Sequence, residues 1–139
     1  MSEQIRAKEL LHSSKVIAVV GISANPSRPS HEVAAYLQRH AYILLLVNPL
    51  EAGHTILGLP CYASLTEAAE KTGKRIDIVD CFRRSEAIPE VVAEAIALHA
   101  GAVWMQQGVI NHDAAKIARD AGLAVIMNRC IKIDHLQLS

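Results

Sequence analysis

The chain has 139 residues, and its 14 lysine and arginine residues balance its 14 aspartate and glutamate residues. Zero formal net charge, with no long run of one sign, argues against a general nucleic-acid or membrane-surface binder, so any anion site must be local. This length predicts a single domain over residues 1–139, with a core that needs no disulfide or metal.

The predicted elements alternate between helices and strands. In chain order they are a helix at Glu3–Leu11, a strand at Val16–Val20, a helix at His31–Arg39, a strand at Tyr42–Val47, a helix at Leu65–Thr72, a strand at Ile76–Phe82, a helix at Ile88–His99, a strand at Ala102–Met105, a helix at His112–Ala121 and a strand at Leu123–Met127. The strands are continuous, β-branched apolar runs, typical of parallel strands buried on both faces. This order predicts a doubly wound α/β fold, a Rossmann-like parallel sheet of about five or six strands with helices on both faces.

Residues at the ends of the predicted helices support these boundaries. Serine and asparagine occupy expected N-cap positions, and glycines follow three of the helices at expected C′ positions. The N-caps are Ser30, Ser64 and Asn111, and the C′ glycines are Gly73, Gly101 and Gly122. The turn-rich segment Gly53–Pro60 leaves room for a short extra strand.

Cysteine usage and the first residues indicate a compartment. Cys61, Cys81 and Cys130 lie far apart and form no C-x-x-C pair, and the N-terminal sequence MSEQIRAKELLHSS has no hydrophobic signal region. No apolar stretch approaches the roughly 18 residues of a membrane span. We therefore expect a reduced, cytoplasmic protein with no membrane partner.

Four loops are predicted to carry the ligand-binding residues. Ligands of doubly wound folds bind beyond the carboxyl ends of the strands, near the point where the strand order reverses. The rule selects the loops Gly21–Ser30, Asn48–Gly53, Arg83–Pro89 and Gln106–Asn111.

The first loop, GISANPSRPS, has the parts of a phosphate-binding site. Gly21 permits a sharp turn, and the following helix offers unpaired N–H groups and a partial positive charge at its N-terminus. Arg28 can add two charge-assisted hydrogen bonds. His31 could touch phosphate or be only a polar first-turn residue. An ordinary loop in which Ser30 only caps the helix would contain the same residues, so both interpretations stay open.

The third and fourth loops offer further candidates. Arg83 fits ligand contact and pairing with an acid of the next helix equally well, whereas Arg84 is expected to be solvated. Phe82 could line an adenine pocket or the core. Gln106, Gln107 and Gly108 follow an apolar strand, where glycine permits close approach of a ligand to the backbone. One of the two amide side chains could face the ligand, and the other could merely anchor the loop.

Several motifs that would indicate other functions are missing. Gly21 is the only glycine between Val20 and His31, so there is no G-x-G-x-x-G, and Asn48 stands where a dinucleotide binder would place an acid. There is no P-loop, and the seven histidines are dispersed, so we expect no metal site and no catalytic constellation. Cys130 follows Arg129, which can favour a thiolate, but a buried, inert thiol is the favoured interpretation.

Six segments together resemble the small bacterial coenzyme A (CoA)-binding proteins. The segments are Ala18-Val-Val-Gly-Ile-Ser23, Asn25-Pro-Ser-Arg-Pro-Ser30, Val47-Asn-Pro49, Asp77-Ile-Val-Asp-Cys-Phe-Arg-Arg84, Val103-Trp-Met-Gln-Gln-Gly108 and Asn128-Arg-Cys130. The resemblance covers nearly the whole length. That family is similar to the CoA-binding domain of the succinyl-CoA synthetase α-subunit and of ADP-forming acyl-CoA synthetases, without their catalytic domains.

The resemblance implies CoA as the ligand. It implies that the first loop faces the CoA phosphates through Gly21, Ile22, Ser23, Asn25, Pro26, Ser27 and Arg28, and that Asn48, Pro49, Phe82 and Arg83 border the nucleotide. Two positions depart from the pattern: Ala41 stands where a glycine is expected before the second strand, and Cys81 where valine is common.

Three functional hypotheses follow. The leading one is a non-catalytic CoA-binding protein, a carrier, sensor or regulatory partner in acyl-CoA metabolism, with no nucleic-acid partner. The second is a subunit or fragment of an acyl-CoA ligase or transferase, although the chain lacks the phosphorylatable histidine segment of the complete synthetases. The third is an NAD-responsive regulator, which the missing glycines and Asn48 disfavour.

Overall fold

The computed structural model describes residues 2–138, in which one seven-stranded sheet is flanked by six α-helices. The strands are β1 (Val16–Val20), β2 (Ile43–Val47), β3 (Thr55–Ile56), β4 (Leu59–Tyr62), β5 (Ile78–Cys81), β6 (Ala102–Met105) and β7 (Ala124–Ile126). The helices are α1 (Glu3–Ser13), α2 (Pro29–Arg39), α3 (Leu65–Thr72), α4 (Ile88–Ala97), α5 (His112–Asp120) and α6 (Ile131–Leu136), with 3₁₀ turns η1 (Pro49–Glu51) and η2 (Ser85–Ala87). None of these helices has the length and apolar character needed to cross a bilayer.

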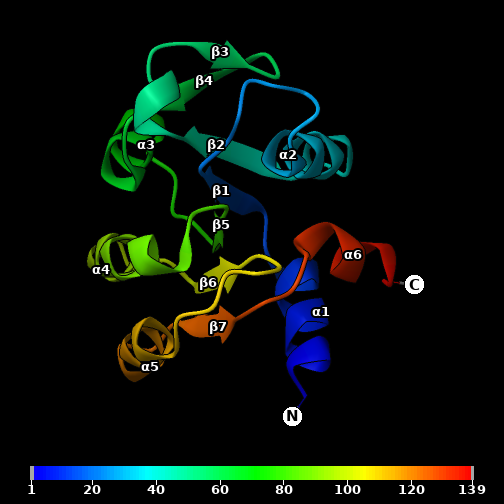
Figure 1. Ribbon diagram of the computed structural model, residues 1–139, viewed down its shortest axis with the longest axis vertical. Helices are drawn as coiled ribbons and strands as arrows, with labels where there is room; N and C mark the ends of the chain where they lie inside the picture. Colours follow the sequence, from blue (N-terminus) through cyan, green and yellow to red (C-terminus); the bar gives the residue numbers. More distant parts are fainter. Residues whose placement is uncertain (1, 139) are drawn as a thin grey trace.

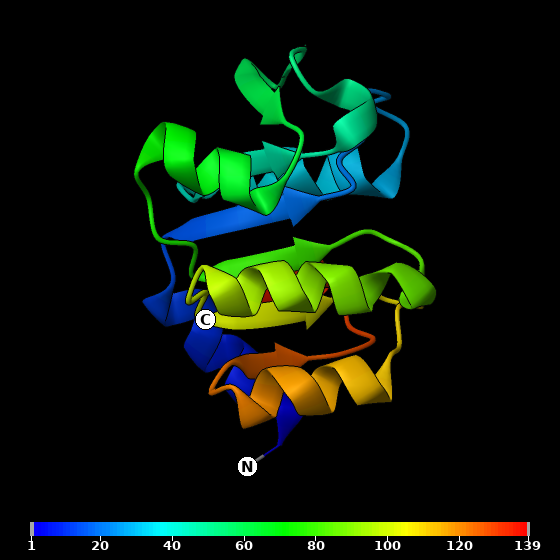
Figure 2. The same ribbon diagram turned by 90° about the vertical axis from the view of Figure 1, so that its left-hand side faces the viewer.

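The strand order is β3-β4-β2-β1-β5-β6-β7, and every neighbouring pair is parallel except β3 with β4. From β1 the chain runs outward through β2 to β4, then returns to add β5 on the other side of β1. The strand order therefore reverses between β1 and β5, and the carboxyl ends of the parallel strands share one edge of the sheet (Figure 2). The predicted doubly wound fold is confirmed.

Helices cover both faces of the sheet. α3, α4 and α5 pack on one face, and α1, α2 and α6 on the other (Figure 1). The central strand β1 is buried along its whole length, with Ala18 and Val20 facing the first layer and Ile17 and Val19 facing the second. This two-sided burial explains why its sequence is continuously apolar rather than alternating.

The sheet has more strands than predicted because Gly53–Pro60 supplies a hairpin. β3 and β4 pair antiparallel around Leu57 and Gly58, which both have positive φ angles, 55° and 75°. Such a two-residue turn matches the twist of a hairpin. β4 then continues the sheet parallel to β2.

The predicted N-caps are confirmed at two of three helices. Ser64 accepts a hydrogen bond from Glu67 N, and Asn111 accepts one from Ala114 N. Ser30 is not an N-cap: α2 begins at Pro29, and the Ser30 hydroxyl instead accepts a hydrogen bond from Ser23 N at 3.0 Å. Its hydroxyl therefore holds the preceding loop rather than the helix end.

Two turns that lead from a helix into a strand place non-glycine residues in the left-handed region. His99 has a φ of 55° just after α4, so Gly101 is not the C′ residue of that helix, whereas Gly73 and Gly122 do end their helices with positive φ. Ala41 has a φ of 71° before β2. This conformation explains why a glycine is expected there.

Candidate functional site

A pocket of about 660 Å³ opens at the carboxyl edge of the sheet, where β1 and β5 lie side by side. It is bordered by the loops after β1, β5 and β6, by the first turns of α2, and by the loop before α6. The lining residues are Gly21, Ser23, Arg28, Pro29, Ser30, Val33, Phe82, Arg83, Arg84, Gln106, Gln107, Gly108, Val109 and Cys130. The pocket therefore lies at the reversal of the strand order, where doubly wound folds bind their ligands.

Gly21 makes the tight turn that opens the pocket. Its φ is 92°, and a Cβ atom built on it would lie 2.3 Å from the carbonyl oxygen of Phe82. Its N–H donates to Val47 O at 2.8 Å, and Phe82 N donates to Val20 O at 2.8 Å. No side chain fits at this position, so the loops after β1 and β5 approach each other closely.

The loop from Gly21 to Ser30 is held by its own polar groups. Ser23 Oγ accepts from Asn25 N at 3.1 Å, and Asn25 Oδ1 accepts from Ser27 N at 3.0 Å. Ser30 Oγ accepts from Ser23 N, and His31 Nδ1 donates to Ser23 O at 2.8 Å. These hydrogen bonds fix the loop in one conformation before any ligand arrives, which lowers the entropy cost of binding.

The loop after β2 braces this first loop from outside the pocket. Asn48 Nδ2 donates to Ile22 O at 2.8 Å, and Asn48 Oδ1 accepts from Leu50 N at 3.0 Å. Neither Asn48 nor Pro49 lines the pocket. The contribution of Asn48 to the site is thus through the position of Ile22.

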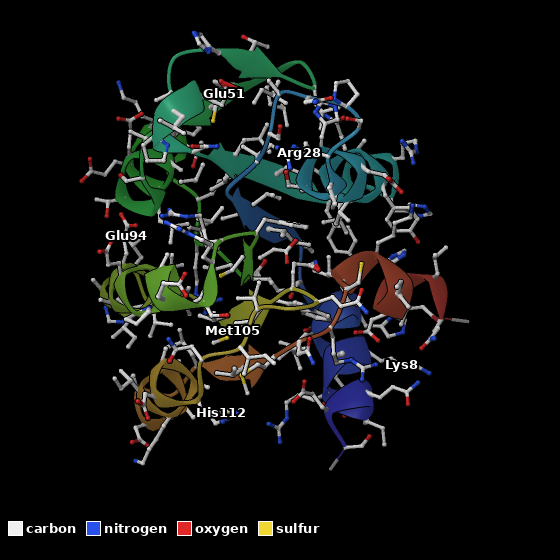
Figure 3. All side chains as sticks on the ribbon, in the orientation of Figure 1. Lys8, Arg28, Glu51, Glu94, Met105 and His112 are labelled. Carbon is white, nitrogen blue, oxygen red and sulfur yellow. The ribbon has the colours of Figure 1, made fainter. Side chains whose placement is uncertain are left out.

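The charge of the pocket is one-sided. Three arginines, Arg28, Arg83 and Arg84, line it, and none of the lining residues is acidic. Within residues 2–138, Arg28 and Arg83 form no ion pair, while Arg84 lies 3.8 Å from Glu86 with both side chains largely exposed. Figure 3 shows Arg28 at the start of α2. A chain with zero net charge therefore gathers positive charge at this one place.

The inner wall of the pocket contains a buried amide. Gln106 is 4% exposed, and its Oε1 accepts a hydrogen bond from Ile131 N at 3.1 Å. Its Nε2 is buried without a partner among residues 2–138. Gly108 N donates to Asn128 Oδ1 at 2.7 Å, which joins the loop after β6 to the loop after β7.

Comparison with known proteins identifies the family. Residues 15–136 match the model of the CoA binding domain. The chain belongs to the CoA-binding domain family. It is 42% identical over 130 residues to the uncharacterized protein YneT of Bacillus subtilis (strain 168), covering 92% of this chain and 90% of that protein.

Solved structures show the same architecture as this CoA-binding domain. The cell-free ID.343 protein from Thermus thermophilus is 34% identical, with a TM-score of 0.90 and complete coverage of both chains. A hypothetical protein from Pyrococcus horikoshii OT3 is also 34% identical, with a TM-score of 0.88 over 99% of this chain and 92% of that one. A dinucleotide-forming acetyl-CoA synthetase from Ca. Korarchaeum cryptofilum is 18% identical, with a TM-score of 0.72 over 86% of this chain and 27% of that chain, a likeness of fold alone.

The CoA-binding domain brings together about half of the residues predicted for the site. Those that line the pocket are Gly21, Ser23, Arg28, Ser30, Phe82, Arg83, Gln107 and Gly108. Those that lie outside its lining are Ile22, Asn25, Pro26, Ser27, His31, Asn48 and Pro49. Ile22 is fully buried, and the polar members of this second group hold the loops by the hydrogen bonds described above.

Six lining residues were not among the predicted contacts: Pro29, Val33, Arg84, Gln106, Val109 and Cys130. Arg84 and Gln106 lie beside the predicted residues Arg83 and Gln107, inside loops that the strand-end rule had already selected. Val33 lies one turn into α2, on its buried side, a position that helical periodicity indicates. Cys130 precedes α6, a helix that the sequence interpretation did not contain.

A buried carboxyl group lies on the strand next to the pocket. Asp80, on β5, is fully buried, and neither carboxylate oxygen has a hydrogen-bond partner among residues 2–138. Burial raises the pKa of Asp80 well above its usual value, and thus favours the neutral acid. Elsewhere in these residues, no three His, Cys, Asp or Glu side chains form a group that could hold a metal ion.

Proposed function

We propose that this protein binds CoA in the pocket between β1 and β5, and that it acts without catalysis as a carrier, sensor or regulatory partner in acyl-CoA metabolism. The observation that carries this proposal is the set of three arginines, with no acidic residue, lining one pocket of a chain with zero net charge. CoA carries a pyrophosphate and a 3′-phosphate, and a phosphomonoester alone contributes roughly −1.5 to −2 charges at neutral pH. Guanidinium groups bind such oxygens by paired, charge-assisted hydrogen bonds.

The backbone of the pocket fits the same ligand. Gly21 lines the pocket without a side chain, so a ligand can approach the main chain there, as phosphates do at the start of helices that follow a strand. α2 begins beside it at Pro29, and Arg28 is its N-cap residue. Phe82 and Val33 add apolar wall suited to an adenine ring or the pantetheine arm.

The composition of the pocket supports binding rather than turnover. Its lining residues include arginines, amides, serines and glycines, but no histidine, lysine or carboxylate to act as a general base. A function as a subunit of an acyl-CoA ligase or transferase stays a prediction, and it would be recognised by turnover that appears only when a partner protein is added.

Titration calorimetry with four ligands tests the proposal. We expect CoA to bind, 3′-dephospho-CoA to bind more weakly, and NAD to bind more weakly than CoA. Acetyl-CoA tests whether the thiol end of CoA is recognised, because its thiol is blocked by the acetyl group. Equal affinity for CoA and acetyl-CoA would show that the thiol lies outside the recognised part of the ligand. Tighter binding of NAD would instead support an NAD-responsive regulator.

Arginine variants locate the site. Arg28→Ala should weaken CoA binding by about 1.5 to 3 kcal/mol, the worth of a hydrogen bond to a charged group, which is roughly 10- to 150-fold in Kd. Arg119→Ala is the matched control, because Arg119 is exposed in the last turn of α5, at the opposite edge of the sheet. Equal affinity of the two variants for CoA would place the phosphates elsewhere.

A further inference from the structure

We propose that Cys130 forms a mixed disulfide with the thiol end of CoA, by exchange with a disulfide of CoA, so that the pocket can hold the molecule covalently. This inference rests on the proposed CoA binding. It adds a redox-dependent modification site to a pocket that otherwise binds reversibly.

Cys130 differs from the other two cysteines in its surroundings. It is partly exposed, it lines the main pocket, and it also borders an adjoining hollow of about 180 Å³ with Gln107 and Ile133. Cys61 and Cys81 are 3% and 0% exposed, and burial raises the pKa of both thiols. A disulfide held in the pocket would therefore meet the sulfur of Cys130 and not that of the other two.

The loop that carries Cys130 is held firmly. Trp104 Nε1 donates to Arg129 O at 2.8 Å, and Arg129 Nε donates to Asp134 Oδ2 at 2.9 Å. Because Asp134 is buried and neutralises Arg129, the backbone on either side of Cys130 has a fixed position. The thiol is thus presented to the pocket by a rigid wall.

Gln106 gives independent evidence that this end of the pocket receives a polar chain. Its Oε1 is occupied by the N–H of Ile131, the residue after Cys130, so its Nε2 is the end left without a partner. A buried amide N–H without an acceptor is costly, and a ligand carbonyl would satisfy it. The pantetheine arm of CoA has two amide carbonyls and ends in the thiol. An arm that accepts a hydrogen bond from Gln106 would bring its sulfur to the wall containing Cys130.

The exchange is balanced in atoms and electrons. The Cys130 thiolate attacks one sulfur of the CoA disulfide, a Cys130 Sγ–S bond forms, and the S–S bond of the disulfide breaks. The departing CoA thiolate takes up the proton that Cys130 released. Cys130 and one CoA sulfur end as a mixed disulfide, and the other CoA leaves as the free thiol. The oxidant is the CoA disulfide itself, and a thiol reductant reverses the reaction.

The pocket should make this exchange selective. A CoA disulfide bound through the arginines holds its S–S bond near Cys130, which turns a bimolecular reaction into an effectively intramolecular one. Glutathione disulfide has the same reactive bond but no nucleotide. We therefore expect CoA disulfide to react about tenfold faster or more at equal concentration.

Intact-mass spectrometry of the reduced protein, incubated with either disulfide, tests the inference. The expected result is the addition of one CoA, reversed by dithiothreitol, mapped to Cys130 by peptide analysis and absent in Cys130→Ser. Arg28→Ala should slow the reaction with CoA disulfide while leaving the slow reaction with glutathione disulfide unchanged. Calorimetry of wild-type protein with CoA under reductant is run in parallel.

The remaining outcomes separate the two proposals. If the reduced wild-type protein binds CoA but CoA disulfide adds nothing at Cys130, the inference is overturned and the binding proposal stands. Equal rates with both disulfides would make Cys130 a merely accessible thiol, which also overturns it. If CoA does not bind under reductant, the binding proposal fails first, and the inference fails with it.

Discussion

Asn48 Nδ2 donates a 2.8 Å hydrogen bond to the carbonyl oxygen of Ile22, so the loop after β2 supports the loop after β1. The other end of the same amide accepts from Leu50 N. Both polar ends of Asn48 are therefore used inside the protein. We therefore expect Asn48, although it lies outside the pocket, to influence ligand binding through the position of Ile22.

Asn48→Ala should lower the free energy of unfolding by about 1 to 3 kcal/mol, because the part-buried Ile22 carbonyl loses its donor. CoA affinity should fall as well, since the first loop loses its support. Urea denaturation and calorimetry measure the two effects. Asn48→Asp, which keeps the acceptor and removes the donor, should destabilise similarly. Unchanged stability with weaker CoA binding would instead mean that Asn48 touches the ligand, as the family resemblance implied.

Gly21→Ala should disrupt both fold and site, because its Cβ would lie 2.3 Å from Phe82 O at a φ of 92°. Gly122→Ala is a close control: its φ is 93°, but nothing lies within 4 Å of the added atom. The control should cost only the strain of the left-handed backbone, about 1 to 2 kcal/mol. Gly21→Ala should cost clearly more in thermal denaturation. Equal losses in both variants would show that the contact with Phe82 is relieved easily.

Asp80→Asn should change how stability depends on pH. Because the pKa of Asp80 is raised in the folded protein, its neutral carboxyl group contributes to the free energy of unfolding. This contribution is fully present below the usual pKa of 3.8 and is lost as pH rises toward the folded-state pKa. As pH rises above 3.8, the wild type should therefore lose stability relative to Asp80→Asn. Urea denaturation of both proteins, with exposed Asp113→Asn as control, measures this difference, and parallel pH curves would contradict it.

His135 should make stability depend on pH in the opposite direction to Asp80. Burial lowers the pKa of His135, and the charges of His40 and His12 lower it further. The contribution of His135 to the free energy of unfolding is therefore fully present above its usual pKa of 6.5, and it is lost as pH falls through the folded-state pKa. The ring lies 2.6 Å from the Tyr36 hydroxyl through Nδ1. His135→Gln should reduce the acid-induced loss between about pH 7.5 and pH 5, whereas exposed His112→Gln should not. The same loss in wild type and His135→Gln would assign the effect to other groups.

Much of the fold follows from local pattern. Runs such as Val16–Val20 are apolar throughout because both faces of the strand are covered, and that signal needs no tertiary information. The hairpin of β3 and β4 was only partly visible, because Leu57 is not a residue that indicates a left-handed turn. α6 escaped prediction because six residues carry little periodicity, and its position depends on contacts with α1 and α2.

The site was predictable to the level of loops but not of side chains. The strand-end rule selected the loops that carry Arg28, Arg83 and Gln107, because it depends only on topology. It could not tell that Asn48 turns toward Ile22 rather than into the pocket. Nor could it place Cys130, which lines the pocket just before α6, where Ile131 N donates to Gln106 Oε1.

Trp104, which donates a hydrogen bond to Arg129 O, can serve as an intrinsic fluorescence probe of the pocket. Trp104 is the single tryptophan of the chain, and it is fully buried on β6 with its indole N–H tied to the loop that carries Cys130. Its emission should therefore respond to movement of that loop. Ligand binding and thiol modification can both be followed by intrinsic fluorescence, in one cuvette and without a label.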